Sequence, residues 1–75
     1  MQVDVYTTQT CPYCFAAKSL LTEKGINFKE HDVSYDPAMR ESLMNKTGRR
    51  TVPQIFFNDE HIGGFVDLEK HFKNQ

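Results

Sequence analysis

The chain lacks the features that mark several specialised protein classes. Its 75 residues contain no tryptophan and only two cysteines, and 9 basic residues are balanced by 10 acidic ones, for a net charge of −1. A nearly neutral chain whose largest basic cluster is Arg49-Arg50 does not favour a nucleic-acid partner. No apolar run approaches the roughly 20 residues of a membrane-spanning helix. We therefore expect a single domain over 1–75 and a monomer, with no nucleic acid and no membrane as partner.

The start of the chain also lacks the pattern of a secretory signal. Met1-Gln2-Val3-Asp4 has no basic region, and no apolar core follows it. A bridge between Cys11 and Cys14 would close too short a loop to constrain the unfolded chain much, so the two cysteines are poor structural staples. A lone C-x-x-C pattern is more typical of a reducing compartment. These points predict a cytoplasmic protein.

The chain alternates strand and helix patterns. Pro12 and Pro37 suit the first turns of helices, Gly25 and Gly48 suit helix ends, and Asp36 is the expected N-cap of the second helix, whose buried side should carry Met39, Leu43 and Met44. We predict strands at 3–6, 26–33, 53–57 and 61–62, helices at 12–24, 37–48 and 67–73, and a hairpin turn at 58–60. The order is β-α-β-α-β-β-α, in which a helical crossover gives a parallel pair and the hairpin adds antiparallel strands.

The two thiols, in Cys11-Pro12-Tyr13-Cys14, lie at the junction between the first predicted strand and the first predicted helix. Unpaired N–H groups and the helix dipole stabilise a thiolate at that position, and a thiolate is the form that attacks disulfides. Cys14 falls one turn inside the helix, where burial raises a thiol pKa. We therefore expect Cys11 as nucleophile and Cys14 as resolving thiol. Half of a zinc site is the alternative, but the three histidines are scattered, and we expect no metal.

Three motifs together resemble the glutaredoxin family: Cys11-Pro12-Tyr13-Cys14, Thr51-Val52-Pro53, and Gly63-Gly64 followed by Asp67. Their order and spacing are similar to those of small bacterial dithiol glutaredoxins over nearly the whole chain. The resemblance implies an α/β thioredoxin-like fold with a central four-stranded mixed sheet flanked by helices. It also implies a thiol-disulfide oxidoreductase with glutathione as co-substrate. Its partners would be glutathionylated or disulfide-bonded proteins, with ribonucleotide reductase among the candidates.

The resemblance also implies where glutathione binds. The Val52–Pro53 bond, which sequence statistics alone predict to be trans, would be cis and would face the thiols. The exposed backbone around Thr51 and Val52 could then pair with an extended tripeptide like an added strand. A proline that merely opens an edge strand is the alternative.

The last motif would hold the γ-glutamyl end of glutathione. Gly64 permits close approach of a ligand, and the following helix N-terminus suits an anion. By resemblance, the backbone of Phe65 and Val66 binds the carboxylate and Asp67 binds the amine, and Tyr13 packs against the tripeptide. The alternatives are a plain turn with Asp67 as a helix cap, and Tyr13 as an ordinary loop aromatic.

Two positions depart from the family pattern. Many relatives carry Lys or Arg three residues before the first Cys, where this chain has Thr8, and Ser, Thr or Asp where it has Val66. Arg49 and Lys18 are the cations that could replace the missing positive charge. Two other functions stay open: a redoxin fed by thioredoxin reductase, and a dimer that holds an iron–sulfur cluster through one thiol and glutathione. The rigid Pro12 argues against the dimer.

Overall fold

A four-stranded mixed sheet organises the computed structural model, which describes residues 1–73; Asn74 and Gln75, the end of the predicted domain, lie outside the described residues. Its strand order is β2-β1-β3-β4. Strand β1 (Val3–Thr7) runs parallel to β2 (Lys29–Asp32) and antiparallel to β3 (Gln54–Phe57), and β4 (Glu60–Gly63) completes the hairpin. The predicted mixed sheet is confirmed.

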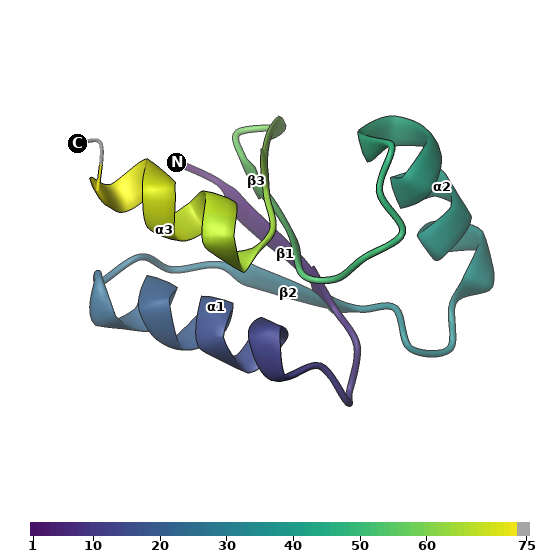
Figure 1. The fold of residues 1–75 in the computed structure, drawn as a ribbon, viewed down its shortest axis with the longest axis horizontal. Helices are drawn as coiled ribbons and strands as arrows, with labels where there is room; N and C mark the ends of the chain where they lie inside the picture. Colours follow the sequence, from purple (N-terminus) through teal and green to yellow (C-terminus); the bar gives the residue numbers. More distant parts are fainter. Residues whose placement is uncertain (74–75) are drawn as a thin grey trace.

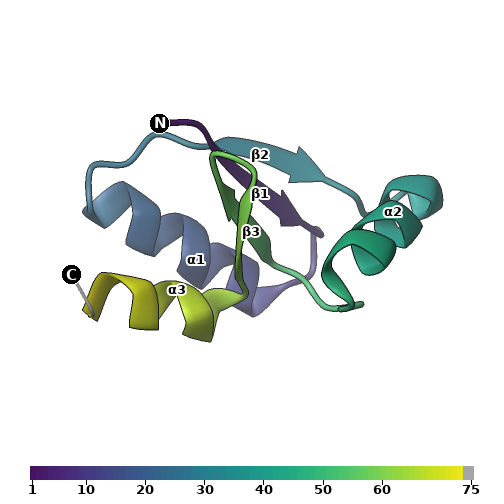
Figure 2. The ribbon, with the colours of Figure 1, turned by 90° about the horizontal axis from the view of Figure 1, so that it is seen from above.

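Three helices accompany the sheet in the predicted order β-α-β-α-β-β-α: α1 (Pro12–Glu23), α2 (Pro37–Thr47) and α3 (Phe65–Lys73). Helices α1 and α3 lie side by side on one face of the sheet, and α2 stands apart from them beyond the end of β2 (Figures 1 and 2). No helix within residues 1–73 is long and apolar enough to cross a membrane. The arrangement is the thioredoxin-like fold that the motifs implied.

The main core lies between the sheet and the pair α1 and α3. Alternate residues of β1 and β3 point toward the helices, as the two-residue period of a strand requires. The buried cluster consists of Val3, Val5, Ala17, Leu21, Ile55, Phe57 and Leu68. Because α1 is anchored by two of these residues, its first turn is held in a fixed position above the end of β1.

The second strand is shorter than the predicted 26–33. The backbone N–H of Ile26 donates to the Leu21 carbonyl, so this residue belongs to the end of α1. Ile26 and Phe28 then pack against the core from a connecting segment, and pairing with β1 begins only at Lys29. The alternation of apolar residues over 26–33 therefore reflects contacts with the core and not pairing with β1.

The other strand and helix boundaries lie within two residues of the prediction. The hairpin turn contains two residues, Asn58 and Asp59, because β4 already begins at Glu60. Both residues have positive φ, 51° and 68°. Helix α3 begins at Phe65, so that Asp67 lies within its first turn.

Helix α2 buries less than its sequence predicted. Leu43 is its buried residue, whereas Met39 is 39% exposed and Met44 only half-buried. The reason is that α2 stands apart from the main core, so that only a narrow stripe of it is covered. Both predicted ends are confirmed: Asp36 accepts from the Met39 N–H at 3.0 Å, and Gly48 is left-handed with φ of 74°.

Helix α2 should therefore depend on its cap. Replacing Asp36 with Ala should lower the free energy of unfolding by about 1 kcal/mol, because the Met39 N–H loses its partner. Asp36→Asn is the matched control, since an asparagine side chain caps equally well. Urea denaturation followed by circular dichroism measures both; equal destabilisation by the two changes would show that the cap is not what Asp36 contributes.

Candidate active site

Cys11 lies at the amino end of α1. Figure 1 shows the loop that follows β1 and turns back into this end of the helix. Cys11 is the N-cap residue, with extended backbone angles, and its Sγ accepts the backbone N–H of Cys14 at 3.1 Å. A side chain that accepts an otherwise unpaired N–H satisfies one of the free donors of a helix end. The first thiol is thus placed where the helix offers its N–H groups, as the sequence predicted.

Cys14 is in a different environment one turn further on. It is 1% exposed, against 8% for Cys11. Burial, followed by the adjacent Cys11 sulfur, raises the pKa of Cys14 to about 12. Cys14 therefore stays protonated at neutral pH, and the predicted burial of the second thiol is confirmed.

The loop before β3 faces the first thiol. The Val52–Pro53 peptide bond is cis, as the family resemblance implied. The Cys11 thiol donates to the carbonyl oxygen of Val52 at 3.5 Å. Two segments about forty residues apart in sequence therefore meet at the sulfur: residues 11–14, which carry the thiols, and residues 51–53, which we call the proline loop.

A cavity of about 270 Å³ opens beside this contact; we call it the cleft. Its lining consists of Tyr13, Thr51, Val52, Pro53, Gly64, Phe65, Val66 and Asp67. These are the eight residues that the sequence assigned to glutathione binding. Tyr13 is 63% exposed and its ring centroid lies 6.2 Å from that of Phe65, so the aromatic side chain is available to a ligand in the cleft.

Asp67 holds one wall of the cleft together. Its Oδ2 accepts the backbone N–H of Gly64 at 3.0 Å and pairs with Arg49 Nη1 at 2.8 Å. The Arg49 guanidinium and the Gly64 N–H lower the pKa of Asp67 below its usual value, so the carboxylate stays charged. Gly63 has φ of 121°, and a Cβ there would collide with the Asp67 carboxylate. The capping role considered for Asp67 is therefore present.

The cations considered as replacements for a lysine at position 8 are both paired. Lys18 bonds Glu30 at 3.0 Å and Arg49 bonds Asp67. Thr8 lines a separate hollow of about 290 Å³, and the cation of that hollow is Arg40. Sequence reasoning missed Arg40, because its position in the first turn of α2 is brought beside Thr8 only by the fold.

A second residue that sequence reasoning missed is Gln54. It is fully buried although it opens an otherwise apolar strand, Gln-Ile-Phe-Phe. An amide in such a run was the available indication, because a buried polar side chain requires partners.

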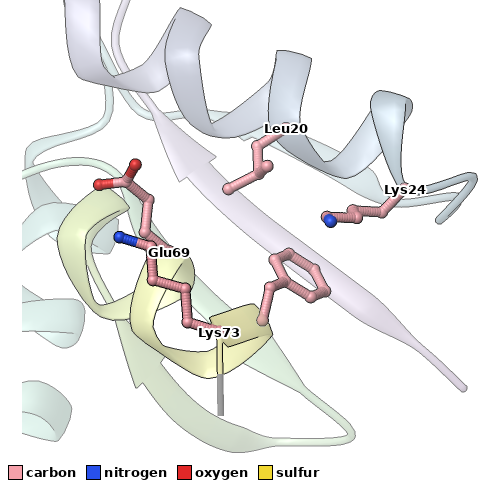
Figure 3. Close-up of a pocket in the computed structure, with 5 residues that line it drawn as sticks. Leu20, Lys24, Glu69 and Lys73 are labelled. Carbon is pink, nitrogen blue, oxygen red and sulfur yellow. The ribbon is translucent and has the colours of Figure 1, made fainter. Parts of the chain in front are cut away.

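A hollow elsewhere on the surface contains no predicted site residue. It measures about 160 Å³ between α1 and α3 and is lined by Leu20, Lys24, Glu69, Phe72 and Lys73 (Figure 3). The Lys24 ammonium lies 5.6 Å from the centre of the Phe72 ring and covers this edge of the core. Within residues 1–73, no three His, Cys, Asp or Glu side chains gather in a way that could hold a metal ion.

The site combines a thiol at the amino end of a helix with a buried second thiol and a facing cis-proline loop. This combination is that of a thiol-disulfide oxidoreductase of the thioredoxin-like fold. The glutaredoxin family model matches residues 3–62. The chain is 50% identical over 66 residues to glutaredoxin 3 of Escherichia coli, an alignment that covers 88% of this chain and 80% of that protein. The chain belongs to the glutaredoxin family.

Solved structures agree with this assignment. The solution structure of a Brucella melitensis glutaredoxin superposes with a TM-score of 0.87 at 42% identity, covering 99% of this chain and 80% of the other. A buckwheat glutaredoxin–glutathione complex superposes with a TM-score of 0.87 at 30% identity, covering 96% and 69%.

The asymmetry of the two thiols predicts their order of alkylation. Iodoacetamide at neutral pH should modify Cys11 well before Cys14, because burial and the neighbouring sulfur keep Cys14 protonated. Peptide mass spectrometry after short labelling of the reduced protein measures this order. Equal labelling of both thiols in the folded protein would contradict it, and labelling in urea, where the difference should disappear, is the control.

Proposed function

We propose that this protein is a glutathione-dependent thiol-disulfide oxidoreductase that reduces protein–glutathione mixed disulfides and protein disulfides. The observation that carries the proposal is the cleft, which is lined by the first turn of α3 and by Val52, the residue whose carbonyl oxygen the Cys11 thiol contacts. The buckwheat relative of similar structure was solved as a complex with glutathione, which supports the same ligand here.

Glutathione fits the cleft by its two ends. An extended peptide beside Val52 can pair with the backbone as an added strand. The γ-glutamyl carboxylate would lie at the amino end of α3, against the N–H groups of Phe65 and Val66. The hydrogen bonds from Arg49 and from the Gly64 N–H both go to Oδ2 of Asp67, which leaves Oδ1 to accept the γ-glutamyl ammonium. Capping and ligand binding by this carboxylate are therefore compatible.

In the monothiol route, the Cys11 thiolate attacks the glutathione sulfur of a protein–glutathione disulfide. A Cys11–glutathione disulfide forms, and the client protein leaves as a thiolate that takes up a proton. The thiolate of a second glutathione then attacks the glutathione sulfur bound to Cys11. Oxidised glutathione is released and the Cys11 thiolate is restored, so that one disulfide is exchanged for another with electrons balanced.

In the dithiol route, Cys11 attacks a client disulfide and Cys14 resolves the mixed disulfide. The client leaves fully reduced and a Cys11–Cys14 disulfide forms, which two glutathione molecules reduce. Glutaredoxin couples lie at about −200 to −230 mV, close to the cytosolic glutathione poise, so the reaction can run in either direction. This chemistry requires a glutathione-rich compartment, for which we propose the cytoplasm, with a monomer as the working unit and ribonucleotide reductase among the candidate clients.

The electron donor tests the proposal. With NADPH and a small disulfide substrate, turnover should require glutathione and glutathione reductase, because the cleft is built beside the thiol for the tripeptide. Thioredoxin reductase in their place should give no turnover. The opposite preference would assign the chain to the redoxins that thioredoxin reductase serves. A coloured protein that elutes as a dimer after anaerobic purification would indicate the cluster-binding alternative.

The two thiols should differ in what their loss removes. Cys11→Ser should abolish activity, because no sulfur remains at the amino end of α1. Cys14→Ser should retain removal of glutathione from a glutathionylated protein and lose most reduction of protein disulfides. Parallel assays on the two kinds of substrate measure this. A Cys14 variant that is inactive toward the glutathionylated substrate would rule out the monothiol route.

A further inference from the structure

Gln54 makes its hydrogen bonds in two directions from a fully buried position. Its Nε2 donates to the carbonyl oxygen of Thr51 at 2.7 Å, and its Oε1 lies 2.6 Å from Nε2 of His61. A carbonyl oxygen only accepts, so the Gln54 atom that faces Thr51 is the amide nitrogen. The amide oxygen is then left to accept the N–H of His61. Neither hydrogen-bonding end of the amide is free, as burial requires.

The two ends of this bridge reach the two walls of the cleft. Thr51 belongs to the proline loop, which forms one wall beside Cys11. His61 lies in β4, which leads directly through Gly63 into Gly64 and the first turn of α3, the other wall. Gln54 itself does not line the cleft. Its side chain connects the proline loop to β4, the strand that leads into the other wall.

The backbone pairing between β3 and β4 is irregular near Gln54. The pairing of β3 with β4 shifts in register between Ile55 and Phe56, so that Ile55 faces Gly63 while Phe56 faces His61. A register shift interrupts the ladder of backbone hydrogen bonds and bends the strand. The shift directly follows Gln54 in the strand, and the Gln54 side chain supplies bonds in addition to the ladder.

We propose that Gln54 and His61 form a positioning pair that sets the separation of the proline loop from the first turn of α3, and thereby the affinity of the cleft for glutathione. The pair touches neither the substrate nor the thiols. It acts through Thr51 on one side and through β4 on the other. The inference rests on the proposed function, because its effect is read out on glutathione.

Three variants test the pair. Gln54→Met keeps the length of the side chain and removes both bonds. His61→Leu removes the donor to Gln54, and His61→Gln keeps an N–H donor close to the position of the imidazole Nε2. Ile55→Val is the control, since Ile55 is equally buried in the same strand but belongs to the core on the other side of the sheet.

The measurements are KM and kcat with glutathione in the coupled assay, the rate of Cys11 alkylation, and the free energy of unfolding. Gln54→Met should raise KM for glutathione roughly three- to tenfold, the range expected when one or two buried hydrogen bonds no longer support the bound geometry. Alkylation of Cys11 should change less than twofold. His61→Leu should raise KM as well, and His61→Gln should stay near wild type. Ile55→Val should lose stability without a change in KM.

A double variant tests directly whether Gln54 and His61 act as one unit. If Gln54 and His61 act as one bridge, adding His61→Leu to Gln54→Met should raise KM no further. Unchanged KM in both single variants, or effects that multiply in the double variant, would overturn the inference. If Gln54→Met does not fold, the comparison of His61→Leu with His61→Gln decides, because His61 is only half-buried. A wild-type protein that shows no glutathione-dependent turnover would overturn the proposed function, and the inference with it, before any variant is made.

Discussion

The contact from the Cys14 backbone N–H to the Cys11 sulfur is the constraint on which the rest of the site depends. It fixes the first sulfur at the end of α1, and α1 is in turn fixed by Ala17 and Leu21 in the core. The position of the sulfur is therefore determined by packing deep in the molecule and by one backbone group. The proline loop completes the site through the contact between the Val52 carbonyl oxygen and this sulfur.

The cleft is assembled from segments that are far apart along the chain, and polar side chains keep them together. Asp67 binds Arg49 from the segment after α2, and Gln54 binds both the proline loop and β4. The apolar core supports the helices, whereas these polar contacts define the shape of the opening. This division lets a small domain form a cleft at its surface.

Local patterns predicted what local forces determine. Proline, aspartate and glycine marked the ends of α2 correctly because capping involves only neighbouring residues. The extent of β2 and the exposure of Met39 could not be predicted, since they depend on where α1 ends and on how far α2 stands from the core. The eight residues of the cleft came from the family motifs. Arg40 did not, because only the fold brings it to the hollow beside Thr8. Gln54 did not either, because the predicted hairpin places it near His61 but does not show that its amide is buried or which groups it binds.

The pairing of the two sulfurs also gives the reaction a sequence in time. Burial comes first among the causes that raise the pKa of Cys14, and the adjacent Cys11 sulfur comes next. The second contribution exists only while Cys11 is free. When Cys11 enters a disulfide with a client, that contribution is lost, and we expect the pKa of Cys14 to fall, although burial, the largest cause, still raises it. In the proposed dithiol route, the reaction of Cys11 with a client would therefore make the Cys14 thiol easier to ionise at the moment when it has to act.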